Sequence, residues 1–186
     1  MPRRNQRIDE EALPVIVPRN TRRLVPMPPE RKRRLMEHLN RLTGDGGADP
    51  FPPEREEFDA QVAGTACGLC QGWCCRNGGD DGFLDERTFA RARREKQMSD
   101  VDTSRRFYYD RVPDESYEGS CIFHGKHGCT LDRSMRSDVC DAYFCGGLEG
   151  YFAGDDRAAP VVIIAGEGRD MRTSQVITKK QRTVRP

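Results

Sequence analysis

The stretch CGLCQGWCC, residues 67–75, places four cysteines within nine positions and ends on an adjacent pair. So many thiols in one short segment are typical of structural disulfides, of a metal site or of a catalytic dithiol. The C-x2-C spacing allows two thiolates to face one ion, and zinc binds four such ligands in a tetrahedron. An iron–sulfur cluster also takes four cysteines, around a larger inorganic core.

The remaining cysteines form a second group of four, so the eight divide naturally into two sites of four. The predicted metal ligands are Cys67, Cys70, Cys74, Cys75, Cys121, Cys129, Cys140 and Cys145. In extended backbone, neighbouring side chains point to opposite sides. We therefore expect Cys74 and Cys75 to point into different sites, or only one of them to bind. Sharing of ions between the two groups would tie residues near 70 to residues near 130.

The composition offers little material for a hydrophobic core. Apolar residues make up 35% of the 186 and charged residues 33%, with a mean hydropathy of −0.80. Such a chain buries little apolar surface against the entropy cost of ordering. Thiolate-bound metal can supply folding free energy on the order of 10 kcal/mol. The sequence therefore predicts a small α+β domain stapled by metal, with short helices and few strands.

Charge is unevenly distributed along the chain. Residues 1–41 carry 11 Lys and Arg against 5 Asp and Glu, and residues 169–186 carry 6 against 1, whereas the centre is acidic. We expect residues 1–28 to be disordered or to form a docking arm, and the chain from Arg169 onward to be loose. These basic tails are candidate contacts for a protein or nucleic-acid partner.

Two of the three explanations for the cysteines are disfavoured. No apolar run reaches the length of a membrane span, and the first residues lack the apolar segment of a secretory signal. We therefore expect a cytoplasmic protein, in a compartment where disulfides are rare. A thioredoxin-type dithiol would lie at a strand-to-helix junction, whereas Cys67 and Cys70 follow a Gly/Pro-rich acidic linker.

The chain divides by composition into four parts: a basic arm with a short helix (1–43), a linker (44–63), a cysteine-cluster domain (64–168) and a basic tail (169–186). In the arm, the pair Pro28–Pro29 predicts a helix start and Gly44 its end. We expect the RKRR run at residues 31–34 to form the solvated face of this helix.

Local signals predict several further elements. A surface helix over residues 84–98 is expected to be capped by Asp85. Other expected elements are a short strand at 120–123 with a return strand at 129–131, a helix from Ser137 to Gly146 and a strand at 159–165. The HGKHG turn, residues 124–128, brings two histidines between candidate ligands. Either His124 or His127 could replace a cysteine, but we expect both to be solvent-exposed turn residues.

With these motifs in place, the sequence resembles the YkgJ-type cysteine-cluster family, described as a zinc- or iron-chelating domain. The residues that carry the resemblance are the C-x2-C-x3-C-C run from Cys67, then Cys121-Ile122-Phe123, Gly128-Cys129, and Arg136-Ser137-Asp138-Val139-Cys140 with Cys145. It covers about residues 64–147. Ser137 stands where the family usually has proline.

The resemblance and the cysteines together predict a protein that holds zinc, iron or an iron–sulfur cluster, such as [4Fe-4S], with a structural or metal-handling role. The sequence shows no paired catalytic carboxylates and no nucleophile–base pair, so an enzymatic activity is left open. One alternative is an iron–sulfur enzyme or redox protein, related to methyltransferases. A second alternative is an accessory protein that binds nucleic acid through its basic tails.

Overall fold

The computed structural model describes residues 12–47, 56–154, 160–167 and 170–177. The chain forms two compact units, each assembled from separate stretches of sequence. We call Met1–Arg19, Arg55–Cys70 and Phe144–Pro186 the sheet unit. We call Asn20–Glu54 and Gln71–Tyr143 the cluster unit. The predicted cysteine domain, 64–168, is thus divided between the two.

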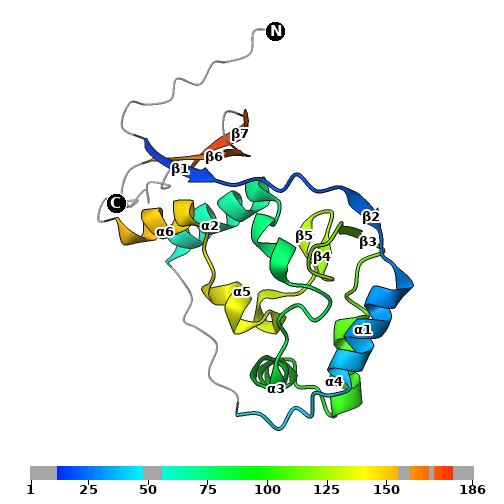
Figure 1. Cartoon of the computed structure of the whole chain (residues 1–186). Coiled ribbons are helices and arrows are strands. Elements are labelled where there is room, and N and C mark those ends of the chain that lie inside the picture. The colour runs from blue at the N-terminus through cyan, green and yellow to red at the C-terminus, as the bar shows by residue number, and fades with distance from the viewer. Residues whose placement is uncertain (1–11, 48–55, 155–159, 168–169, 178–186) are drawn as a thin grey trace, which may run out of the picture. The chain divides into compact units, whose positions relative to one another are not determined.

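The sheet unit contains a three-stranded sheet in the order β1-β6-β7 (Figure 1). Its strands are β1 (Leu13–Val17), β6 (Val161–Glu167) and β7 (Asp170–Ile177). β1 pairs in parallel with β6, and β7 pairs antiparallel to it. The prediction of disordered tails was therefore wrong for residues 13–17 and 170–177. Residues 1–11 and 178–186 of these tails lie outside the described part of the chain.

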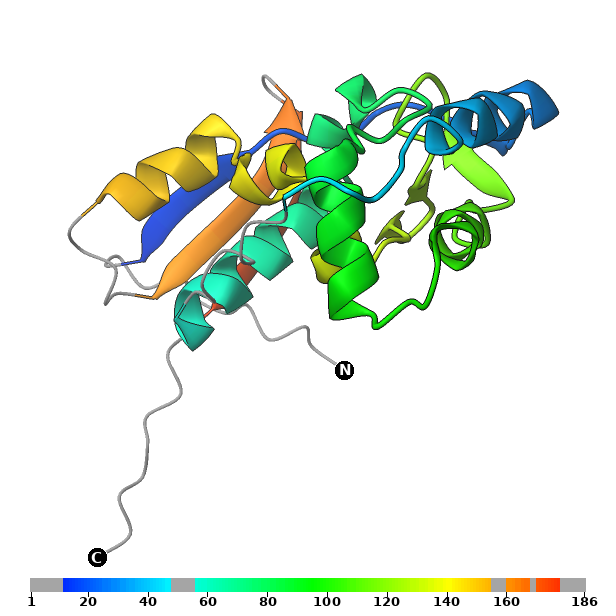
Figure 2. The same ribbon diagram turned by 90° about the horizontal axis from the view of Figure 1, so that it is seen from below.

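Two helices cover one side of this sheet, α2 (Glu57–Cys70) and α6 (Gly146–Ala153) (Figures 1 and 2). Side chains alternate along β1, with Val15 and Val17 buried and Ile16 exposed, as expected for a sheet with one covered face. The Tyr151 hydroxyl of α6 donates a hydrogen bond to the carboxylate of Asp59 in α2, at 3.1 Å. Since α2 begins at Glu57, the predicted linker 44–63 was wrong over its last seven residues.

The cluster unit consists of short elements joined by tight turns. Two antiparallel strand pairs are β2 (Leu24–Pro26) with β3 (Glu115–Tyr117), and β4 (His124–Gly125) with β5 (Gly128–Cys129). Its helices are α1 (Pro29–Leu39), α3 (Glu86–Glu95), α4 (Val101–Tyr109) and α5 (Asp138–Ala142), with the 3-10 turns η1 (Trp73–Asn77) and η2 (Arg133–Met135). The expected strand at 120–123 is absent from the described residues, because the hairpin begins only at His124.

The hydrophobic core of the cluster unit is built around α3. Phe89 stacks on Tyr108 of α4 with ring centroids 5.8 Å apart, and both side chains are fully buried. The core also contains Leu35, Leu39 and Phe123. The prediction that α3 lies on the surface was wrong, because its five consecutive residues from Thr88 to Ala92 are buried. Its predicted cap is confirmed, since Asp85 accepts a hydrogen bond from the Thr88 amide.

The helix predicted from Ser137 to Gly146 is two helices. Ser137 caps α5 as expected, but α5 ends at Ala142 and a new helix, α6, begins at Gly146. The helix α1 is confirmed near its predicted start, and it ends before Gly44. In the parts of the chain that the structure describes, no helix combines the length and the apolar character needed to cross a bilayer.

The RKRR run of α1 is only partly a solvated face. Arg31 and Arg34 both form ion pairs with Asp80, and the Arg31 side chain is only 13% exposed. Arg31 also donates to the backbone carbonyl of Ser120, next to Cys121. The first basic side chain of the run therefore fastens α1 to the loops that carry cysteines.

Candidate metal centre

Five of the eight cysteines come together inside the cluster unit. We call this group the thiol cluster: Cys74, Cys75, Cys121, Cys129 and Cys140. These thiols are close enough to shift one another's pKa. Cys121 and Cys129 raise the pKa of Cys75, and Cys129 and Cys74 raise the pKa of Cys140. The five thiols come from η1, the loop before β4, β5 and α5, so four separate segments converge here.

The other three predicted ligands belong to the sheet unit. Cys67 and Cys70 lie in the last turn of α2, and Cys145 is the residue before α6. Their C-x2-C spacing is therefore part of a helix, in which residues three apart share a face. None of the eight cysteines is part of a disulfide in the structure.

The adjacent pair lies on a 3-10 turn instead of extended backbone. As a result Cys74 and Cys75 are close enough for the Cys75 thiol to donate a hydrogen bond to Cys74. This bond is the largest cause that lowers the pKa of Cys74 to about 7, against the opposing effect of burial. The same bond, with burial, raises the pKa of Cys75. Cys75 is therefore the hydrogen-bond donor of the pair, and Cys74 is the more acidic thiol of the two.

Backbone hydrogen bonds join η1 to the chain at Cys121. The Cys121 amide donates to the Cys75 carbonyl at 2.8 Å, and the Ile122 amide donates to the Gly79 carbonyl at 2.8 Å. A Cβ at Gly78 would lie 2.7 Å from the Cβ of Cys121, so only glycine allows this approach. Cys121 is buried, and burial raises its pKa to about 12.

The loop before Cys74 is folded over a buried histidine. His124 Nε2 donates to the Gln71 carbonyl at 3.0 Å, so Nδ1 accepts from the Ser120 hydroxyl at 2.8 Å. A Cβ at Gly72 would lie 2.3 Å from His124 Nε2. Our expectation of an exposed turn residue was wrong for His124, which is 1% exposed, and right for His127, which is exposed. His124 has both nitrogens engaged, so it positions the loop and is not free to bind an ion.

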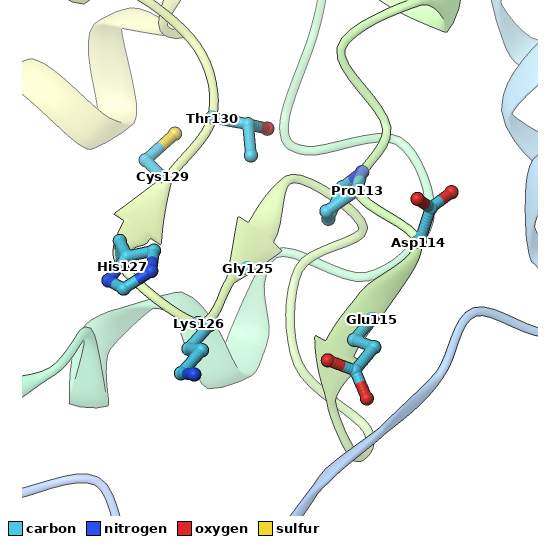
Figure 3. A pocket seen from close by; sticks show the side chains of 9 residues that line it. Pro113, Asp114, Glu115, Gly125, Lys126, His127, Cys129 and Thr130 are labelled. Atoms are coloured by element: carbon cyan, nitrogen blue, oxygen red, sulfur yellow. The ribbon is translucent and has the colours of Figure 1, made fainter.

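A hollow of about 380 Å³ lies beside the β4–β5 hairpin, between Pro113 and the strand that carries Cys129 (Figure 3). Gly125 allows this close packing, since a Cβ there would lie 3.2 Å from the Pro113 ring. The carboxylates of Asp114 and Glu115 border one side, and Lys126 and His127 border the hairpin side (Figure 3). The hollow leaves β5 open to solvent on this side.

One cation lies among the thiols. The Arg136 guanidinium forms a hydrogen bond with Cys129 that opposes the rise in its pKa due to burial, and it also helps to lower the pKa of Cys74. Arg136 Nε donates to the Leu131 carbonyl at 3.1 Å, which fixes the side chain. A basic side chain four positions before Cys140 is visible in the sequence, but its contact with Cys129 could not be predicted from it.

Cys140 is held by the residue that caps its helix. The Ser137 hydroxyl donates to the Cys140 sulfur at 3.2 Å and accepts from the Cys140 amide at 3.2 Å. Next to it, the Asp141 carboxyl is 4% exposed, and burial raises its pKa. Its closest cation is Arg133, with Nε at 3.6 Å. Sequence analysis missed Asp141, because an acidic residue in a short helix looks solvent-exposed.

The five thiols of the cluster are of the chemical type that binds zinc or iron, but they do not stand in the geometry of a metal site. Among the described residues, no three Cys, His, Asp or Glu side chains stand in an arrangement that could hold a metal ion. Cys74 and Cys140 are exposed, whereas Cys121 is buried. An incoming ion would therefore meet Cys74 and Cys140 first.

Comparison with known proteins adds no relative: no family model, no curated protein and no solved structure matches this chain.

Proposed function

We propose that this protein binds a soft metal ion, zinc or iron, through thiolates of the thiol cluster, with a structural or metal-handling role. The observation that carries the proposal is the convergence of five free thiols from four segments of the cluster unit. Cysteine thiolates are the preferred ligands of zinc and of iron–sulfur clusters. The resemblance to the YkgJ-type family favours the same function.

The electrostatics of the cluster support a cationic occupant. Burial raises the pKa of Cys121, Cys129 and Cys140, and neighbouring thiolates raise it further. Thiolates packed this closely repel one another unless a cation neutralises them, and a bound metal deprotonates its thiol ligands outright. Arg136 supplies only one positive charge to this group. Binding requires rotation of some of the cysteine side chains, because among the described residues no three ligand side chains now stand in an arrangement that could hold a metal ion.

Zinc and iron would give this site different roles. Zinc coordinated by four cysteines forms a closed structural site. An iron–sulfur cluster would instead supply electron transfer. The alternative of an iron–sulfur enzyme therefore shares the ligands of the proposal and differs from it in the metal. Cys67, Cys70 and Cys145 stay sequence predictions as ligands, since they belong to the sheet unit.

The test is purification without oxygen, followed by elemental analysis and a visible absorption spectrum on the same sample. Zinc with no colour would support a structural or zinc-handling role. Iron with matching acid-labile sulfide and a broad visible band would support the iron–sulfur alternative. Neither metal above background, also after incubation of the reduced chain with zinc or with ferrous iron and sulfide, would contradict metal binding altogether.

A pair of variants assigns the metal to the cluster. Cys129→Ser replaces a cluster thiol by a much weaker ligand and should lower the bound metal per chain. Thr130→Ser changes the adjacent exposed residue, keeps a hydroxyl and removes no thiol, so its metal content should equal that of the unaltered chain. Equal metal content in both variants would show that Cys129 is not a ligand.

A further inference from the structure

The segment before Cys140 is fixed from the core by a buried arginine. Arg91 of α3 is 2% exposed, whereas Arg87 and Arg94 on the same helix are exposed. Its guanidinium donates to the Arg136 carbonyl at 2.6 Å and forms an ion pair with the Asp138 carboxylate. These two partners flank Ser137 on both sides.

Burying a guanidinium is costly, and removing one of its partners is strongly destabilising. The guanidinium contacts a stretch of three residues, 136–138, which is also held by the hydrogen bond from Arg136 to the Leu131 carbonyl and by the short helix α5. The fork of the guanidinium can engage a carbonyl and a carboxylate at the same time, which a lysine cannot do with the same geometry. Arg91 therefore fixes the position of the Ser137 backbone relative to α3.

Ser137 in turn holds Cys140. A hydroxyl has one donor and two acceptor positions, and here it uses the donor on the Cys140 sulfur and an acceptor on the Cys140 amide. Ser137 is itself 1% exposed, whereas Cys140 is exposed. An exposed cysteine would otherwise be free to sample several rotamers.

We propose that Arg91 and Ser137 are positioning residues for Cys140: the guanidinium fixes the backbone on either side of Ser137, and the Ser137 hydroxyl then holds the Cys140 sulfur with the rest of the thiol cluster. The inference rests on the proposed metal-binding function and deepens it. Groups that orient a ligand in this way typically account for about 10–100-fold in metal affinity. The hydrogen bond to sulfur exists before any ion arrives, so the arrangement is built into the metal-free chain.

The experiment compares Ser137→Ala with Ser137→Thr in the full chain, with Co²⁺ as the probe. Alkylation by iodoacetamide is measured at each cysteine by mass spectrometry, in metal-free and in cobalt-loaded protein. In Ser137→Ala we expect a changed alkylation rate of Cys140 without metal, and faster alkylation of Cys140 with cobalt while Cys121 and Cys129 stay protected. We also expect cobalt affinity to fall by about 10–100-fold. Ser137→Thr keeps the hydroxyl and should restore the original behaviour.

Arg91→Lys tests the step further from the sulfur, with Arg94→Lys on the exposed part of the same helix as control. Arg91→Lys should speed the alkylation of Cys140 selectively, whereas Arg94→Lys should leave the alkylation rate of every cysteine unchanged. General destabilisation would instead speed alkylation of the buried Cys121 as well, so equal acceleration of both thiols overturns the inference.

The outcomes separate the inference from the function on which it rests. If the unaltered chain binds no cobalt, both the proposed function and the inference fail. If it binds cobalt, and Cys140 in Ser137→Ala reacts as in the unaltered chain, the inference alone fails.

Discussion

At the scale of single residues, the adjacent pair Cys74–Cys75 carries the most distinctive chemistry. The 3-10 turn places the two thiols within hydrogen-bonding distance, and Cys75 is the donor. Cys74 therefore has a pKa lowered to about 7 and is also exposed. Exposed thiolates of lowered pKa are the ones that react with metals and electrophiles.

The reactivity of Cys74 in the metal-free chain should reveal this pairing. Its alkylation rate should rise with pH around a midpoint of about 7, whereas Cys121, with a pKa raised to about 12, should react only after unfolding. In Cys75→Ala the donated hydrogen bond is lost, so the midpoint of Cys74 should move up towards the ordinary value of 9.0. Rates at each cysteine are read by mass spectrometry. A midpoint near 9 in the unaltered chain contradicts the pairing.

His124 should make stability depend on pH. Burial is the main cause that lowers its pKa below 6.5. Below pH 6.5 the unfolded chain binds a proton there and the folded chain does not, so the free energy of unfolding should decrease as the pH falls. His124→Gln should remove this part of the slope and also lower stability at neutral pH, because the two ring hydrogen bonds are altered. Urea unfolding at several pH values measures it.

The control for the substitution itself is His127→Gln, at an exposed position of the same hairpin. It should change the free energy of unfolding at neutral pH by less than about 0.5 kcal/mol, as is usual for surface substitutions. An unchanged slope in His124→Gln would show that another group causes the pH dependence.

At the scale of elements, α3 is the centre of the cluster unit. Phe89 on its buried side packs against Tyr108, and Arg91 on the same helix reaches the segment before Cys140. The helix thus links the hydrophobic core to a candidate ligand. Its sequence, ERTFARARRE, resembles that of a surface helix, because its four arginines make it strongly polar although one face is fully buried.

Phe89→Ala should therefore lower the free energy of unfolding by about 3–5 kcal/mol, the usual cost of a buried phenylalanine. Phe83→Ala is the matched control, since Phe83 is 37% exposed and Phe89 is fully buried. Its effect should be within about 1 kcal/mol. Both are measured by urea unfolding. Equal losses in the two variants would contradict the placement of α3 in the core.

The sequence allowed prediction of those elements whose signals are local. The caps Asp85 and Ser137 and the turn of the β4–β5 hairpin depend on short-range chemistry, and all three are found. β1 could not be foreseen, because Leu13–Val17 acquires its partner β6 almost 150 residues later. Burial of Arg91 and His124 was missed for the same reason: their hydrogen-bond partners are distant in sequence. β7 was missed although its partner β6 lies directly before it in the sequence, because the basic composition of this segment indicated disorder.

The candidate site shows the same division. The sequence identified the cysteines but not which of them meet, since the boundary between the two units falls between Cys70 and Gln71. Their spacing suggested two sites of four, whereas the structure gathers five thiols in one unit. Ser137 could be predicted as a helix cap and Arg136 as a basic side chain near Cys140, but their contacts with cluster sulfurs could not be predicted.

At the scale of the whole molecule, the two units obtain their stability differently. The sheet unit has a continuous ladder, β1-β6-β7, and its β6 is buried over most of its length. Among the described residues, the strand pairs of the cluster unit are two and three residues long, and the unit carries five thiols. Bound metal should therefore matter more to the cluster unit than to the sheet.

Removal of metal by a chelator should lower amide hydrogen-exchange protection at Cys121–Phe123 and in the β4–β5 hairpin, while β6 keeps its protection. Exchange reports local opening free energies segment by segment. Equal loss of protection in β6 would show that the sheet also depends on the metal. No loss in either unit would mean that the metal contributes nothing to folding.

The central claim is that thiolates of the cluster hold a metal ion, and X-ray absorption at the edge of the bound metal tests it most directly. The account predicts sulfur neighbours at about 2.3 Å for zinc, and loss of sulfur scattering in Cys129→Ser but not in Thr130→Ser. A first shell of nitrogen and oxygen atoms at about 2.0–2.1 Å, unchanged by Cys129→Ser, would contradict it.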